Sequence, residues 1–283
     1  HAARASAGKR KGIGQRGSAE DRGMSEAVKL SVEGGVATIA LNRPHVMNAM
    51  DGEMMQQMRP IAEAVERDSS VRAVVLRGEG AAFMAGGDVA VFHQQLADLP
   101  ELIVTWGREM HAAFLALRRM GKPVLASVHG AVAGAGFSLM CAADLAIAAV
   151  DTRFTLAYAN IGASPDGGST YFLPRLVGYK KTMEMIMLPD RFDAETARLH
   201  GLVNWVVPND RLAAETARIA QRLAAGPTRA YAEGKRLVNQ SLDPLNAQME
   251  QELQAFSRCA RGPDLKEGVS AFVEKRKPVF KGA

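Results

Sequence analysis

Cysteine and long apolar runs are scarce in this sequence, and each shortage excludes a class of protein. Its 283 residues include two cysteines, Cys141 and Cys259, and neither has a second thiol or a histidine at the spacing of metal ligands. We therefore expect no disulfide framework and no metal site, but the reduced thiols of a cytoplasmic protein. No apolar run approaches the roughly 20 residues that a transmembrane helix needs, so a membrane partner is not expected.

Sequence motifs of several common enzyme classes are also missing. Gly134-Ala135-Gly136 begins like a dinucleotide-binding fingerprint, but that pattern requires a glycine at position 139, where the chain has Leu139. The sequence contains no P-loop, no G-x-S-x-G nucleophile elbow and no H-E-x-x-H motif. Dinucleotide-dependent, nucleotide kinase, serine hydrolase and zinc peptidase chemistry are therefore disfavoured.

The net charge of +5 is concentrated in residues 1–23. Six basic and two acidic residues lie in this segment, which leaves the rest of the chain nearly neutral. A nearly neutral body gives little electrostatic reason to bind nucleic acid. Gly, Ser, Ala and Arg without apolar periodicity predict a disordered basic tail over 1–23. We expect this tail to be an added or upstream-translated extension before a native start at Met24.

From residue 24 to about Pro208, short apolar segments alternate with helical patterns. The apolar segments predict buried strands over 36–41, 73–77, 123–128 and 145–149. Apolar residues at helical spacing predict helices over 51–67 and 100–120. This alternation predicts an α/β fold with a parallel sheet over 24–208.

After Pro208 the sequence has helical patterns only, over 209–225, 227–241, 243–261 and 263–276. Helices without strands between them cannot easily bury their own apolar faces. We therefore expect the region 209–283 to pack on the core or on another subunit.

Two turns of small residues could offer backbone N–H groups to one oxygen atom. Ala85-Gly86-Gly87 follows a predicted strand, and Gly134-Ala135-Gly136 precedes a predicted helix. A pair of such N–H groups is what stabilising a thioester enolate requires. Each turn alone is better explained as ordinary tight-turn chemistry, but the two together favour a functional site.

The order of the motifs resembles the crotonase superfamily, the enoyl-CoA hydratase/isomerase family. The resemblance covers about residues 26–281 and rests on the segments 41–50, 83–88, 122–136, 143–144, 173–178 and 194–203. It implies a spiral of β-β-α turns with a C-terminal helical region that mediates trimers. It also implies an acyl-CoA thioester substrate, with coenzyme A arriving as part of the substrate and no other cofactor, and a homotrimer or a dimer of trimers.

The resemblance assigns roles to individual residues. Gly87 and Ala135 correspond to the two N–H donors that hold the thioester oxygen. The hydratases of the family carry two glutamates, at positions where this chain has Ser138 and Tyr158. Because neither side chain is a general base near neutral pH, efficient hydration is not expected.

Asp166 is the acid that the sequence retains, in a Pro-Asp-Gly-Gly turn. This turn resembles that of the Δ3,Δ2-enoyl-CoA isomerases and of the ring-epoxide isomerase of phenylacetate degradation, in which the aspartate shuttles a proton. A structural alternative is a helix start, with Ser164 as cap, Pro165 at the first position and Asp166 in the first turn. Both roles are compatible.

The same resemblance places further residues around the substrate. Arg43 corresponds to the region around the adenine and phosphates of coenzyme A, and Phe280 and Lys281 to a C-terminal end that reaches a neighbouring subunit. Ala85 and Asp88 belong to the first turn. Tyr158 lines the acyl pocket or hydrogen-bonds the substrate, or else only packs, and Ser138 is a small residue that makes room.

The predicted function is isomerisation of an acyl-CoA through an enolate. The alternatives are a hydratase with weak activity, a dehalogenase-like enzyme in which Asp166 attacks an aryl carbon, and a non-catalytic homologue that binds CoA or associates with RNA.

Overall fold

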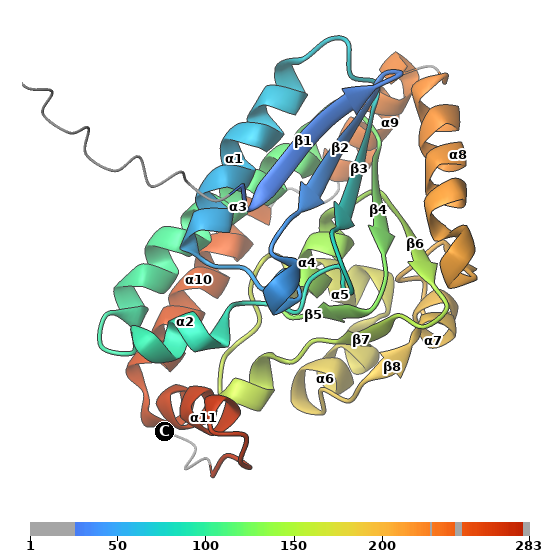
Figure 1. The fold of residues 1–283 in the computed structure, drawn as a ribbon. Coiled ribbons are helices and arrows are strands. Elements are labelled where there is room, and N and C mark those ends of the chain that lie inside the picture. Colours follow the sequence, from blue (N-terminus) through green and yellow to red (C-terminus); the bar gives the residue numbers. More distant parts are fainter. Residues whose placement is uncertain (1–25, 227, 241–244, 280–283) are drawn as a thin grey trace, which may run out of the picture.

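A six-stranded sheet runs through the centre of the molecule in the order β1-β2-β3-β4-β6-β9 (Figure 1). The computed structural model describes residues 26–226, 228–240 and 245–279. β1 and β2 form an antiparallel hairpin, and the other neighbours in the sheet are parallel. The strands are β1 (Val28–Glu33), β2 (Val36–Leu41), β3 (Ala73–Gly78), β4 (Val124–Val128), β6 (Leu145–Ala149) and β9 (Trp205–Val207).

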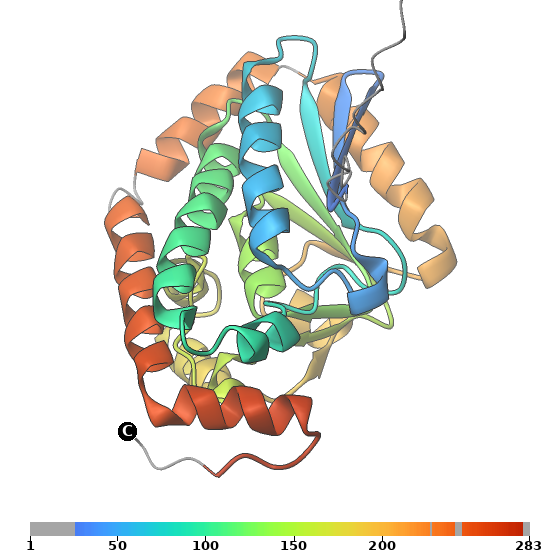
Figure 2. The same cartoon turned by 60° about the vertical axis from the view of Figure 1, so that its left-hand side comes forward.

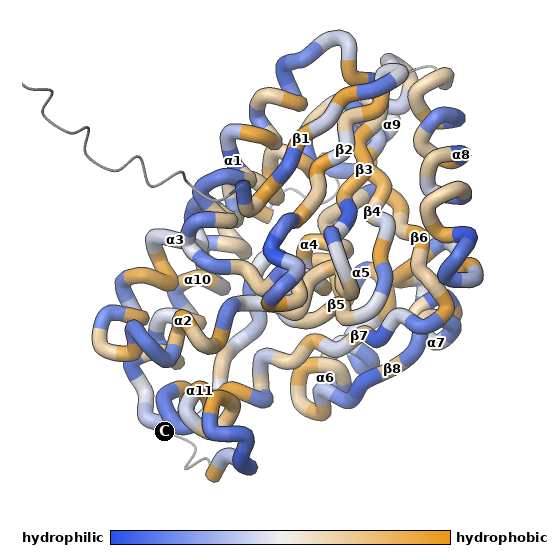
Figure 3. The backbone as a smooth tube through the Cα atoms, viewed as in Figure 1, coloured by the Kyte–Doolittle hydropathy of each residue, from blue (hydrophilic) through white to orange (hydrophobic). Residues whose placement is uncertain are grey.

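The central strands are buried on both faces, as their continuous apolar sequences predicted. Val74 and Leu76 of β3 point into the main core, whereas Ala73 and Val75 pack towards α8 (Leu212–Ala224) on the opposite face. Figure 3 shows β3, β4 and β6 as mostly hydrophobic segments. Two-sided burial therefore explains why these strands lack polar alternation.

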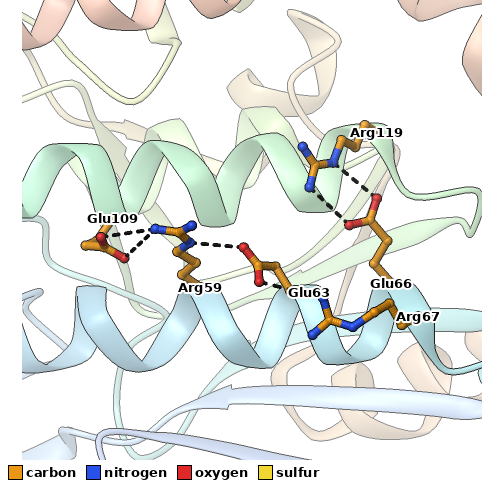
Figure 4. A network of polar contacts seen from close by, with 6 residues as sticks. All are labelled: Arg59, Glu63, Glu66, Arg67, Glu109 and Arg119. Carbon is orange, nitrogen blue, oxygen red and sulfur yellow. Dashed lines mark hydrogen bonds and ion pairs between the residues drawn. The ribbon is translucent and has the colours of Figure 1, made fainter.

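Two long helices, α1 (Gly52–Arg67) and α3 (Leu99–Arg119), pack side by side on the main-core face (Figure 2). Asp51 caps α1 by accepting a hydrogen bond from the Met54 N–H at 2.9 Å. Figure 4 shows the charged outer seam of this pair, where Arg59 binds Glu109 and Arg119 binds Glu66. Exposed ion pairs of this kind add little stability, so the packing of apolar side chains holds the two helices together.

A second, smaller sheet and a set of short helices cover the ends of the parallel strands. This sheet has the order β5-β7-β8. Its strands are β5 (Ala131–Ala133), β7 (Arg153–Thr155) and β8 (Phe192–Asp193). The short helices are η1 (Pro44–Val46), α2 (Val89–Gln94), α4 (Ala135–Ala142), η2 (Tyr158–Ile161), α5 (Ser169–Leu176), α6 (Tyr179–Met187) and α7 (Ala194–Leu199).

The described part of the C-terminal region is helical and packs on the core. α10 (Leu245–Arg261) lies along α3, and α11 (Pro263–Val273) lies against α2 and η2 (Figure 2). Gly268 allows α11 to contact η2 this closely, because a Cβ atom on Gly268 would lie 2.4 Å from the Ile161 carbonyl group. η3 (Asn209–Arg211), α8 and α9 (Thr228–Gln240) complete this region.

Some sequence expectations need correction or stay open. The two- and three-residue strands of the small sheet were not predicted, nor were β1 and β9. Within the described ranges, no helix is both long and apolar enough to cross a membrane. Both cysteines are free thiols, and Cys141 is buried. The tail 1–23 and the predicted residues Phe280 and Lys281 lie outside the described residues.

Candidate active site

The two turns of small residues lie against each other, the first between β3 and α2 and the second directly after β5. Met84 in the first turn pairs with Val132 of β5, and the Ala133 N–H donates to the Met84 carbonyl at 2.9 Å. Gly86 and Gly134 both have positive φ, at 102° and 49°. A Cβ on Gly86 would lie 3.3 Å from the Ala133 carbonyl oxygen, tighter than most Cβ contacts, so glycine suits this turn through both its backbone conformation and its close approach to β5.

The backbone N–H groups of Gly87 and Ala135 remain open at this contact. Hydrogen bonds from Met50 N to the Gly86 carbonyl and from Asp88 N to the Met50 carbonyl flank Gly87 without using its N–H. Ala135 is the first residue of α4, where an N–H has no partner inside the helix. Within the described residues, neither N–H donates to a protein acceptor. Both residues line the same cavity, so their N–H groups are available to a ligand.

This cavity has a volume of about 780 Å³ and extends from the two turns towards α3 and the C-terminal helices. Its walls are mainly apolar and include Met55, Phe92, Ile103, Trp106, Met110, Phe256 and Phe272. Phe256 comes from α10 and Phe272 from α11, so the C-terminal region completes the cavity of its own chain. The sequence did not predict these two residues, because their helical spacing looks like ordinary packing.

Asp166 is the buried acid of the cavity. Asp166 lines the cavity and is only 6% exposed. Burial raises the pKa of its carboxyl group, and a hydrogen bond from Tyr158 lowers this pKa in part, so that it lies at about 6. The cavity lining contains two other carboxylates, Asp88 and Asp151, in the part of the chain that the structure describes. Asp88 pairs with Arg43, and exposed Asp151 accepts a hydrogen bond from Asn209 at 2.6 Å. Asp166 is thus the lining carboxylate best suited to proton transfer.

The predicted position of Asp166 in a helix is wrong in detail. α5 begins at Ser169 after Gly168, so Asp166 precedes the helix and does not lie in its first turn. Gly167 and Gly168 have φ values of 61° and 84°, a conformation that glycine adopts without strain. These two glycines separate the aspartate from the helix and leave its side chain in the cavity.

Tyr158 and Ser138 are both in contact with Asp166. The Tyr158 hydroxyl donates to Asp166 Oδ1 at 2.6 Å, and Ser138 Oγ donates to the Asp166 backbone carbonyl at 2.9 Å. The two hydroxyl oxygens are 3.2 Å apart. The two residues that the sequence resemblance placed at the glutamate positions therefore both contact Asp166. Tyr158 lines the cavity, and its expected contact with an acyl group stays a prediction.

Arg43 is not among the residues that line the cavity, and its expected place near coenzyme A stays a prediction. Its guanidinium group binds Asp51 and Asp88, each at 3.0 Å, and also the Ala49 carbonyl. Asp88 in turn caps α2 by accepting from the Val91 N–H. These contacts fix the first turn relative to α1 and α2. Ala85 and Asp88 lie in the lining, beside the open Gly87 N–H.

Two arginines that sequence reasoning missed lie at the exposed edge of the cavity. Arg153 belongs to β7 and Arg191 precedes β8, and both line the cavity. Arg191 forms no ion pair with any described residue. Isolated arginines gave no sequence signal, because only the second sheet brings 153 and 191 together.

Comparisons with known proteins show which family and which fold this chain shares. The family model described as "Enoyl-CoA hydratase/isomerase" matches residues 31–283. The 1,2-epoxyphenylacetyl-CoA isomerase of Escherichia coli is 35% identical over 92% of this chain and 100% of its own. A probable enoyl-CoA hydratase of Rhodobacter capsulatus is 36% identical over 90% of this chain and 98% of its own.

A solved structure has the same fold. The enoyl-CoA hydratase of Mycobacterium avium subsp. paratuberculosis superposes with a TM-score of 0.82 at 30% identity, covering 90% of this chain and 98% of that one. The α/β fold predicted from the sequence is confirmed by this likeness.

Proposed function

Because the chain belongs to the enoyl-CoA hydratase/isomerase family, we propose that it isomerises an acyl-CoA thioester through an enolate. The observation that carries this proposal is one buried carboxylate, Asp166, in the same cavity as the two open N–H groups of Gly87 and Ala135. The substrate would be a 3-enoyl-CoA converted to its 2-trans isomer, or a ring-epoxide acyl-CoA. The E. coli relative bears the name of an isomerase of the second kind.

The proposed reaction needs two steps of proton transfer. Asp166 removes a proton from the carbon next to the thioester, and the electron pair moves into the enolate, whose oxygen accepts hydrogen bonds from Gly87 and Ala135. Asp166 then returns the proton two carbons further along, and the double bond is left conjugated with the thioester. A base with a pKa of about 6 is ionised at neutral pH and still accepts a proton readily.

This chemistry needs no metal and no redox cofactor, and coenzyme A enters as part of the substrate. The apolar walls suit the acyl group, whereas Arg153 and Arg191 at the exposed edge suit the phosphates.

We also propose the cytoplasm as the site of action and a homotrimer or a dimer of trimers as the assembly. Exposed apolar side chains support association, including Tyr179, Met187, Leu188 and Leu199, and light scattering on the purified protein measures the mass.

The direct test is to mix the protein with 3-hexenoyl-CoA and follow the absorbance of the conjugated thioester. We expect turnover by the wild type and a loss of kcat of about 100-fold or more in Asp166→Asn, because the proton shuttle is removed. Asp210→Asn, at an exposed position in η3 outside the cavity lining, is the matched control and should retain activity. Wild-type protein inactive on aliphatic and aryl 3-enoyl and epoxide thioesters, or an unchanged Asp166→Asn variant, would refute the proposal.

Hydration of an enoyl-CoA is the second candidate, favoured by the name of the R. capsulatus relative. Against it, the described lining residues include no glutamate, and the sequence resemblance places Ser138 and Tyr158 at the positions of the hydratases' two glutamates. Turnover of crotonyl-CoA that survives Asp166→Asn would favour the hydratase.

A further inference from the structure

Tyr158 is held in one place by an unusual stretch of backbone. Ala157 before it has a φ of 58°, a left-handed conformation that alanine seldom adopts, and Gly162 closes η2 with a φ of 71°. The Ala163 N–H donates to the Tyr158 carbonyl, and the residue is 7% exposed. The tyrosine ring is therefore fixed on the cavity side before any substrate arrives.

The hydroxyl of Tyr158 contacts one oxygen of Asp166 and leaves the other open. Its donor distance to Oδ1 is 2.6 Å, short for a bond between neutral groups and typical of one to a carboxylate. Within the described residues, Tyr158 is the one hydrogen-bond donor to this carboxylate. Oδ2 is consequently the atom left for the substrate.

Ser138 holds the same aspartate from the other side, through its main chain. Its Oγ donates to the Asp166 carbonyl, and Gly167 permits this approach because a Cβ there would lie 2.8 Å from the Ser138 Cβ. The backbone of Asp166 is thus fixed by Ser138 and its carboxylate by Tyr158. Two hydroxyl groups together determine where Oδ2 lies.

We propose that Tyr158 is a positioning residue for the isomerisation, whose hydroxyl holds Asp166 Oδ1 so that Oδ2 alone exchanges the proton with the substrate. During the reaction the carbon–hydrogen bond next to the thioester breaks, its electron pair enters the enolate, and its proton goes to Oδ2. The same proton then forms the new carbon–hydrogen bond. Tyr158 keeps its own proton throughout. This inference rests on the proposed function.

The groups around Asp166 make Tyr158 the main polar influence on its ionisation. Ser138 faces it from α4, Ser169 from α5 and Tyr158 from η2, while the Phe114 ring of α3 lies beside Gly167. In the described part of the chain no charged group shifts the Asp166 pKa, which burial raises and Tyr158 lowers. Removing the Tyr158 hydroxyl should therefore raise the pKa of Asp166 and shift the pH dependence of the reaction to higher pH.

The test is Tyr158→Phe, which removes one oxygen and keeps the ring. We expect the midpoint of the kcat/KM against pH profile to move upwards by about one pH unit, because a lost hydrogen bond to a charged group is worth roughly tenfold or more. We expect kcat to fall about 10- to 100-fold, with KM nearly unchanged. Tyr171→Phe is the matched control, since Tyr171 is buried on α5 and does not line the cavity. It should leave the midpoint in place.

A second variant keeps the result interpretable if Tyr158→Phe folds poorly. A fluorinated tyrosine at position 158 preserves the shape and makes the hydroxyl a stronger donor, so the midpoint should move to lower pH. An active wild type whose midpoint and kcat are unchanged in Tyr158→Phe overturns this inference and leaves the proposed function standing. A wild type inactive on every thioester overturns both.

Discussion

At the scale of single residues, the burial of Asp166 defines the pH range in which the site can act. Its pKa of about 6 lies well above that of an exposed aspartate, so the carboxylate is protonated in mildly acidic solution. We expect kcat/KM for a 3-enoyl-CoA to be constant above about pH 7 and to fall about tenfold per pH unit below about pH 5. Initial rates in constant-ionic-strength buffers measure this. A flat profile down to pH 4.5 would show that Asp166 is not the base.

The same burial means that the ionised carboxylate of Asp166 destabilises the folded state. The pKa of Asp166 in the folded protein lies above the unfolded value near 3.9. The contribution of Asp166 to the free energy of unfolding is therefore most favourable below pH 4 and is lost as the pH rises through 6. We expect Asp166→Asn to raise the free energy of unfolding by about 1–3 kcal/mol at pH 8 and by much less at pH 4. Urea unfolding at both values measures this.

Exposed Asp151→Asn provides the reference for that comparison, with no gain expected at either pH. A loss of stability in Asp166→Asn at pH 8 would contradict the account, because it would mean that the ionised carboxylate stabilises the fold.

The sequence predicted the roles of individual residues unevenly. Asp166 could be singled out because it is the sole acid in a long segment with turn signals around it. The contact between Asp166 and Tyr158 could not be predicted. The two residues lie eight positions apart, and no regular helix or strand joins them, so no periodicity relates their side chains. The sequence also gave no sign that two aspartates, Asp51 and Asp88, bind the guanidinium group of Arg43.

At the scale of elements, the contact between α11 and η2 depends on a glycine. Gly268→Ala would place a methyl group 2.4 Å from the Ile161 carbonyl carbon, so the helix must move away. We expect increased hydrogen exchange in α11 and η2, together with a higher KM for the acyl substrate, because Phe272 of α11 lines the cavity. Hydrogen-exchange mass spectrometry and steady-state kinetics measure these effects.

Gly234→Ala in α9 is the matched control, because a Cβ there meets nothing within 4 Å. Alanine at this position should be neutral, or stabilise the helix by up to about 1 kcal/mol. Equal effects of the two substitutions would argue against the close approach of α11.

The elements that could be predicted are those whose packing leaves a regular pattern. α1 and α3 bury one face each, and β3 and β4 are buried on both, so helical spacing and continuous apolar runs identified them. The strands β5, β7 and β8 have only two or three residues, too few to show a period. The start of α5 was misplaced because Ser164-Pro165-Asp166 resembles a helix start, whereas the positive φ values of Gly167 and Gly168 delay the helix to Ser169.

At the scale of the whole molecule, the cavity joins an apolar interior to a cationic edge. Arg191 is exposed there and has no ion-pair partner among the described residues, so a phosphate of coenzyme A is its proposed contact. We expect Arg191→Ala to raise KM for an acyl-CoA about fivefold, equivalent to about 1 kcal/mol, with kcat unchanged. The corresponding N-acetylcysteamine thioester, which lacks phosphates, should show no such increase.

Arg222→Ala, on the exposed surface of α8 and away from the cavity, controls for the loss of one positive charge. If both variants raise KM equally, the effect is one of net charge. An equal effect of Arg191→Ala on the two thioesters would place the arginine near the acyl group.

Phe256 and Phe272, the aromatic walls supplied by α10 and α11, have a consequence for synthesis. A ribosome finishes the sheet, both turns and Asp166 long before it adds these helices, so the nascent chain carries the reactive groups without a closed compartment around them. A chain released early would keep Asp166 and both turns but lack the cavity walls that Phe256 and Phe272 supply. Folding of α10 and α11 therefore completes the cavity after the rest of its lining has been synthesised.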